Sequence, residues 1–202
     1  MIDRLIVADV VAATRIWLEK AVIGLNLCPF AAPVHLHDRI RYFVSPACSP
    51  GMLLQDVLSE LRALDAADPD ECETTLLIHP NVLANFADYN DFLPRADDAV
   101  AELGLEGVVQ IASFHPQYQF ADAAPDDISN YTNRSPYPML HLLRESSVER
   151  AVTHYPDTTA IYKSNIETLR RLGHEGWRQL WLAQTPGANP LPARRSNKSN
   201  SN

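Results

Sequence analysis

The sequence lacks several features that would assign it to a common class of proteins. It contains no run of about 20 apolar residues that could cross a bilayer, and it starts Met-Ile-Asp-Arg instead of with the basic and apolar regions of a secretory leader. No GxGxxG, GxxxxGKS/T or GxSxG motif occurs, which disfavours nucleotide cofactors, P-loop chemistry and classical hydrolases. We therefore expect no cofactor and no membrane association.

Cysteine and positive charge are also scarce. The 3 cysteines show no CxxC spacing, as expected for reduced thiols, and this predicts a cytoplasmic protein. With 17 Lys and Arg against 25 Asp and Glu, the net charge is −8, which argues against nucleic acid as a partner. Nothing in the sequence indicates an oligomeric state.

The length and composition fit one globular domain followed by a tail. The chain has 202 residues, of which 46% are hydrophobic, as in ordinary soluble domains. Residues 184–202 combine Pro, Ser, Asn and basic residues without apolar periodicity, so they cannot bury enough apolar surface to offset their chain entropy. We predict a single domain over residues 1–183 and a disordered basic tail over residues 184–202.

Strand-like and helix-like segments alternate in the first part of the chain. The expected strands are residues 40–44, 74–78 and 107–114. The first two expected helices run from Asp9 to Gly24 and over residues 52–64. A third helix is expected between the last two strands, capped by Asn81 and kinked at Pro94. This alternation predicts an α/β fold in which βαβ crossovers build a small parallel or mixed sheet covered by helices.

Beyond residue 114 the pattern predicts a C-terminal helical segment. Pro138 is expected to open a helix over residues 139–152, and Asp157 to precede a second helix that ends at Gly173. A short last helix is expected around Trp177 and Trp181.

Two of the predicted strands end in a His-Pro pair. His79-Pro80 follows the strand at 74–78, and His115-Pro116 follows the strand at 107–114. Proline restricts the residue before it, so each imidazole should be held in one direction at the carboxyl edge of the sheet, where open sheets bind ligands. Because imidazole titrates near neutral pH, His115 and His79 are candidate general acids or bases.

A second group of polar residues lies between Asn130 and Pro138 and on the helix expected to follow. Amide, hydroxyl and guanidinium groups ahead of a helix N-terminus favour an anionic ligand. With one residue from the loop after the third strand, the candidate substrate-binding residues are Tyr118, Asn133, Arg134, Ser135, His141 and Arg144. His141 and Arg144 are expected to share one helix face.

Metal and thiol chemistry have weaker support. No HExxH or CxxC spacing is present, so we predict no metal, although histidines from separate elements can form an open zinc site. Cys28 lies just past the first helix, and a small buried thiol is normally an inert core residue.

Three stretches of the chain resemble a bacterial family catalogued as domain of unknown function 1415. They are Gly24 to Ala31, Ser113 to Phe120, and Asn133 to Pro138 with His141 to Glu145, and the resemblance spans roughly Thr14 to Trp181. The family implies no activity. It does imply that the stretches around His115 and Arg134 belong together, and it makes Cys28 a candidate catalytic residue.

The leading hypothesis from the sequence is a hydrolase or group transferase that acts on a small anionic metabolite. His115 would be the general acid or base, Arg134 and Arg144 would bind the anion, and Asn133 and Tyr118 would orient it. Two alternatives stay open. One is a non-catalytic ligand-binding or regulatory protein that uses the same pocket, and the other is a thiol or metal site that combines Cys28 with His79 or His115.

Overall fold

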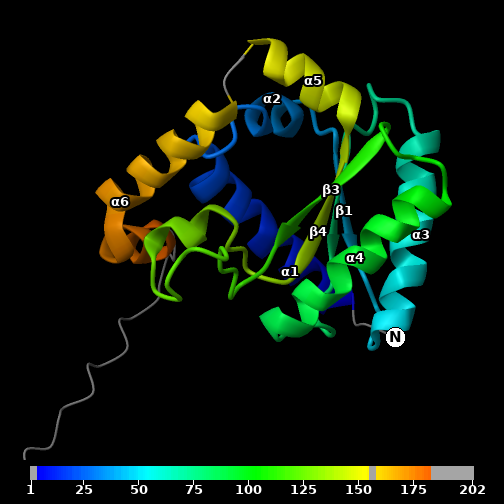
Figure 1. Cartoon of the computed structure of the whole chain (residues 1–202), viewed down its shortest axis with the longest axis horizontal. Helices are drawn as coiled ribbons and strands as arrows, with labels where there is room; N and C mark the ends of the chain where they lie inside the picture. Colours follow the sequence, from blue (N-terminus) through cyan, green and yellow to red (C-terminus); the bar gives the residue numbers. More distant parts are fainter. Residues whose placement is uncertain (1–3, 155–157, 183–202) are drawn as a thin grey trace, which may run out of the picture.

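The computed structural model describes residues 4–154 and 158–182, so the expected tail lies outside the described residues (Figure 1). The strands are β1 (Ile40–Val44), β2 (Thr74–Ile78), β3 (Val109–Phe114) and β4 (Met139–Arg144). The helices are α1 (Arg4–Trp17), the π-helical turn η1 (Leu18–Ile23), α2 (Ala31–Leu36), α3 (Pro50–Ala66), α4 (Phe86–Glu102), the 3-10 helix η2 (Ile128–Thr132), α5 (Glu145–His154) and α6 (Thr158–Leu182).

The four strands form one mixed sheet in the order β1-β2-β4-β3. β1 and β2 are parallel, and β4 runs antiparallel to both of its neighbours, β2 and β3. β1, β2 and β3 therefore end at the same edge of the sheet, and β4 begins there. The α/β class, the mixed sheet and the helical crossovers through α3 and α4 are confirmed.

Helices cover both faces of the sheet. On one face, Leu77 and Leu140 of the two central strands lie in the same core cluster as Leu61 of α3 and Phe92 of α4. On the other face, the strands pack against α1, η1 and α6 through residues that include Trp17 and Leu169. Full burial of such a large apolar side chain contributes about 1.5–3 kcal/mol, so the two central strands are held from both sides.

The prediction of a helix over residues 139–152 is wrong for the first part of this range. Met139–Arg144 forms strand β4, and helix α5 begins only at Glu145. A strand that is buried on both faces is apolar at nearly every position, and this pattern resembles a buried helix. Because side chains three apart in a strand face opposite sides, His141 and Arg144 do not share a face.

Two smaller differences concern the start of α1 and the cap of α4. α1 begins at Arg4, ahead of Asp9. Asn85, not Asn81, caps α4 by accepting a hydrogen bond from the backbone N–H of Ala87 at 2.8 Å, and Pro94 lies inside that helix. Gly173, where a helix end was expected, has a non-helical backbone at φ 65°, a left-handed conformation that favours glycine, and it separates two helical parts of α6 as predicted. The expected cap Asp157 lies outside the described residues.

The hydroxyl of Tyr89 in α4 joins β3 to β4 at the carboxyl edge. It accepts a hydrogen bond from the backbone N–H of Phe114 at 3.1 Å and donates one to the carbonyl of Met139 at 2.8 Å. Tyr89 is completely buried, so water cannot replace these bonds. The hydroxyl therefore satisfies two main-chain groups of the sheet at once.

We predict that Tyr89→Phe lowers the free energy of unfolding by about 1–3 kcal/mol, because it leaves buried main-chain groups without a partner. Urea denaturation measures this change. Tyr162→Phe removes a hydroxyl from a side chain that is 48% exposed and should change stability by less than about 0.5 kcal/mol. Equal effects of the two substitutions would contradict the role given to Tyr89.

Candidate functional site

The carboxyl edge of the sheet gathers the segments that follow β1, β2 and β3, together with the segment that precedes β4. Residues 115–138 leave the edge at the end of β3 and return to it at the start of β4. This connection carries η2, which packs beside α6 (Figure 1). The two polar stretches that the sequence singled out therefore lie at the same edge.

Asparagine side chains hold this connection together. The backbone N–H of His115 donates to the carbonyl of Asn133 at 3.1 Å, and the Asn133 amide donates to the carbonyl of Ser113 at 3.0 Å. Asn130, which is buried, accepts from the backbone N–H of Phe120 at 3.0 Å and donates to another carbonyl of the loop. Asn133 therefore fixes the chain instead of pointing a free amide at a ligand.

Arg134 is held in place by the same connection. Its Nε donates to the carbonyl of Tyr118 at 3.2 Å, and its Nη2 donates to the carbonyl of Pro125 at 2.8 Å. The guanidinium carbon lies 4.3 Å from the centre of the Tyr131 ring. Within residues 4–154 and 158–182, Arg134 forms no ion pair with a carboxylate and Nη1 makes no hydrogen bond. The charge is thus fixed in position but not neutralised.

A cavity of about 450 Å³, which we call the Arg134 cavity, lies beside this guanidinium. Its walls come from α1, α6 and both ends of the 115–138 connection. They are mainly aromatic and proline side chains. The lining residues are Ala13, Ile16, Trp17, Pro116, Tyr131, Arg134, Ser135, Pro136, Trp177 and Trp181.

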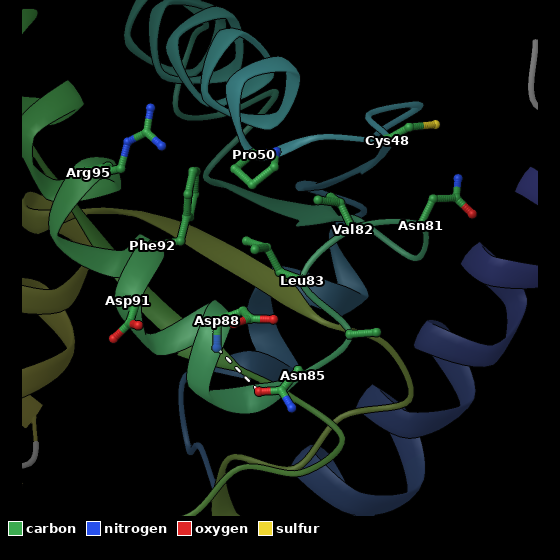
Figure 2. Close-up of a pocket in the computed structure, with 11 residues that line it drawn as sticks. Cys48, Pro50, Asn81, Val82, Leu83, Asn85, Asp88, Asp91, Phe92 and Arg95 are labelled. Atoms are coloured by element: carbon green, nitrogen blue, oxygen red, sulfur yellow. Dashed lines mark hydrogen bonds between the residues drawn. The ribbon is translucent and has the colours of Figure 1, made fainter.

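A second cavity, of about 640 Å³, lies between the N-terminal end of α3 and α4 (Figure 2). Cys48 and Asn81 lie at one end of it and Arg95 at the other. Asp88 and Asp91 also line it, so the charges around this cavity are of both signs. No residue that the sequence marked as catalytic or substrate-binding lies in its lining.

His115 and His79 flank the buried Tyr89 ring, with ring centres 5.0 and 5.7 Å from it. Both histidines are completely buried. Nδ1 of His115 accepts from the backbone N–H of Gln117 at 3.0 Å, so Nε2 carries the proton and donates to the carbonyl of Leu83 at 3.1 Å. Both ring nitrogens of His115 are therefore engaged by the main chain.

His79 is bonded through one nitrogen only. Nδ1 donates to the carbonyl of Val82 at 3.0 Å, and Nε2 is buried with no partner among the described residues. Burial lowers the pKa of His79 to about 4, and it also lowers the pKa of His115. Both imidazoles are neutral at physiological pH, since burial penalises the charged form.

His141 and Arg144 lie along β4, and neither lines the Arg134 cavity. The His141 imidazole bonds to the Thr74 hydroxyl at 2.7 Å, and burial lowers its pKa to about 4. Arg144, at the far end of the strand, donates to the carbonyls of Leu64, Ala67 and Cys72 around the C-terminal end of α3. Carbonyls at a helix C-terminus carry partial negative charge, so a buried guanidinium is stabilised there.

Cys28 lies in the turn between η1 and α2, and α2 leads into the start of β1. Figure 1 shows α2 at the end of the sheet where β4 passes into α5, opposite the carboxyl edge. In the described part of the chain, no hydrogen bond joins Cys28 to His79 or His115. Burial raises the pKa of the Cys28 thiol, which disfavours the reactive thiolate. Within residues 4–154 and 158–182, no three His, Cys, Asp or Glu side chains are arranged to hold a metal ion.

The remaining predicted residues differ in their relation to the cavity. Ser135 lines it, and its hydroxyl donates to the carbonyl of Tyr137 at 2.7 Å. Tyr118 supplies a carbonyl to Arg134 while its ring packs against Phe86 and Phe120. The aromatic walls were missed by the sequence analysis, because tryptophans at helical spacing are normally explained by core packing.

The fold and this cavity define an α/β protein with an aromatic cavity and a fixed cation at the carboxyl edge of a mixed sheet. The family described as "Protein of unknown function (DUF1415)" matches residues 9–179, so the chain belongs to that family. The resemblance read from the three stretches is confirmed. Neither the comparison with curated proteins nor the comparison with solved structures found a match. No helix in the described part of the chain has the length and apolar content needed to span a membrane.

We predict that acid weakens the fold through His79. Its folded pKa of about 4 lies below the ordinary value of 6.5, so the unfolded chain takes up the proton first. Stability present above pH 6.5 is therefore lost as pH falls toward 4, by roughly 3 kcal/mol for such a shift. In His79→Gln, the slope of unfolding free energy against pH over this range should be smaller by about one proton, as measured by urea denaturation.

His37→Gln, at an exposed histidine, provides the matched control for this measurement. A slope in His79→Gln equal to that of the wild type would show that His79 does not carry the acid sensitivity.

We predict a structural role for Arg144. Arg144→Met removes the donor to the buried carbonyl of Leu64 and to the half-buried carbonyls of Ala67 and Cys72, and a buried acceptor left without a partner costs about 1–3 kcal/mol. The free energy of unfolding should fall by at least about 2 kcal/mol. Arg95→Met, at an exposed position of α4, should change it by less than about 0.5 kcal/mol. Wild-type stability of Arg144→Met would refute this assignment.

Proposed function

We propose that this protein is a cytoplasmic ligand-binding protein that holds a small anionic molecule in the Arg134 cavity. The observation that carries the proposal is the guanidinium of Arg134, which is fixed by two carbonyls and a tyrosine ring at a cavity wall and has no carboxylate partner among the described residues. A fixed cation in a partly apolar cavity attracts an anion more strongly than a cation in open water does.

Binding is favoured over catalysis by the state of the histidines. A general acid or base must reach the substrate through a ring nitrogen, directly or through one water. Both ring nitrogens of His115 are bonded to the main chain, and neither His115 nor His79 lines the Arg134 cavity. The Asn133 amide is likewise committed to a carbonyl of β3. His115 and Asn133 therefore use these groups to hold the main chain, and His79 lies outside the lining of the cavity.

The other cavity is a poorer place for an anion. Asp88 and Asp91 contribute two carboxylates to its lining against one guanidinium, from Arg95. Like charge repels an anionic ligand, and the Asn85 side chain in this cavity already caps α4. Arg95 therefore provides a matched control for Arg134, because each is the arginine of one cavity.

We predict that Arg134→Gln weakens binding of small anions roughly ten- to a hundredfold, as expected for the loss of one charge-assisted contact of about 1.5–3 kcal/mol. Benzoate, cyclohexanecarboxylate and inorganic phosphate are titrated by isothermal calorimetry into wild type, Arg134→Gln and Arg95→Gln. Every anion that binds the wild type should keep its affinity in Arg95→Gln.

Thermal melting of the three proteins without ligand separates lost binding from lost folding, because Arg134 also bonds two carbonyls. The titrations are run well below the lowest melting temperature. If none of the three anions binds the wild type, or if binding is equal in Arg134→Gln, the proposed function is wrong.

A further inference from the structure

We infer that the ligand of the Arg134 cavity is an aromatic carboxylate, whose flat ring lies among the tryptophan side chains while its carboxylate meets Arg134. This inference rests on the proposed function, since it names the chemical class of the anion. It begins from the walls of the cavity. All 3 tryptophans of the chain line it, and they come from helices at opposite ends of the sequence.

The aromatic walls have the geometry that accepts a flat ring. Tyr131 and Trp177 meet edge to face with ring centres 4.9 Å apart, and Trp177 and Trp181 do so at 5.5 Å. Rings set nearly at right angles offer a face and an edge to a third ring, and both contacts are favourable for an aromatic partner. Pro116 and Pro136 add two rigid apolar surfaces. A volume of about 450 Å³ lies within the range of small-molecule sites.

These walls are fixed before a ligand arrives. Trp17 is only 4% exposed, packs edge to face against Phe114 at 5.5 Å, and donates its indole N–H to the carbonyl of Arg134 at 2.9 Å. Lys20 of η1 donates to the carbonyl of Leu180 at 2.8 Å and so ties α6, which carries two of the tryptophans, to the N-terminal helix. A rigid cavity loses little conformational entropy on binding, which favours a rigid ligand of matching shape.

The polar groups of the cavity select a carboxylate. Aromatic cages usually attract cations, but the Arg134 guanidinium already lies over the Tyr131 ring, and it repels a second cation. The indole N–H of Trp17 and the hydroxyl proton of Ser135 are committed to backbone carbonyls. Among the lining residues, Nη1 of Arg134 is the cationic donor that makes no hydrogen bond in the described part of the chain. A single guanidinium matches a singly charged anion better than a phosphate, which normally gathers several donors.

Three probes of similar size separate the ring from the charge. Benzoate has both, cyclohexanecarboxylate has the charge on a ring that is not aromatic, and benzamide has the aromatic ring without the charge. Because all the tryptophans line the cavity, intrinsic fluorescence reports binding there without a label. We expect wild-type protein to bind benzoate about tenfold more tightly than either of the other two probes, by fluorescence and by calorimetry.

Two substitutions of Trp181 test the aromatic wall itself. Trp181 lies near the end of α6 and is partly exposed, so its replacement disturbs the core less than replacement of Trp17 would. In Trp181→Leu, the preference for benzoate over cyclohexanecarboxylate should fall to about twofold or less. In Trp181→Phe, most of the preference should return, because an aromatic ring is restored. Melting temperatures without ligand check that both variants are folded.

The outcomes distinguish this inference from the proposed function. Equal affinity for benzoate and cyclohexanecarboxylate, with both lost in Arg134→Gln, would overturn the aromatic ligand and leave the anion-binding function intact. Binding of benzamide as tight as that of benzoate would overturn the role of the charge, and with it both proposals. If Trp181→Leu kept the full wild-type preference for benzoate, the ring would not lie against this wall and the inference would be wrong.

Discussion

The direction of β4 determines the arrangement of everything at the carboxyl edge. β1, β2 and β3 all run the same way, and β4 lies antiparallel between β2 and β3. An antiparallel strand must start at the edge where its neighbours end. The chain between β3 and β4 therefore cannot cross the sheet as α3 and α4 do, and residues 115–138 have to fold back on the edge that they left.

A long connection of this kind carries many polar main-chain groups that need partners. The asparagines supply several of them, and Arg134 supplies more by bonding the carbonyls of Tyr118 and Pro125. Trp17 then ties the connection to α1 through the carbonyl of Arg134. The cavity is a consequence of this packing: α1 and α6 cover one face of the sheet, and the connection meets both helices at the edge.

The sequence predicted the elements whose pattern of apolar and polar residues fits only one type of secondary structure. The strands at 40–44 and 74–78 were predicted at their observed bounds, since β-branched or alternating residues flanked by breakers admit few other structures. β4 was mistaken for a helix because its neighbours on both sides bury it, and burial on both faces erases the alternation that identifies a strand. No local sequence pattern reveals that β4 is a strand. Its position between β2 and β3 decides this, and that position depends on contacts between residues that are distant in the sequence.

The same limit applied to the site. Asn133, Arg134 and His115 were singled out as polar residues in the right segments, and the structure places all of them at one edge. The sequence could not show which partners the hydrogen-bonding groups of these residues have. The ring nitrogens of His115 and the amide of Asn133 serve the main chain. Tyr89, which connects β3 to β4, was missed because a buried tyrosine in an amphipathic helix is first explained by its ring.

Polar side chains that recur together in a family can serve either the fold or a ligand, and the two roles differ in their hydrogen-bond partners. A residue that serves the fold has its donors and acceptors matched by the protein, as Arg144 does with the carbonyls around the end of α3. A residue that also binds a ligand keeps a donor, an acceptor or a charge without a protein partner at an open surface. Arg134 has both features. Its Nε and Nη2 donate to carbonyls, while Nη1 makes no hydrogen bond and the positive charge has no carboxylate partner in the described part of the chain. Its fixed bonds hold the guanidinium in one orientation beside the tryptophans, so the entropy of orienting that charge is lost during folding.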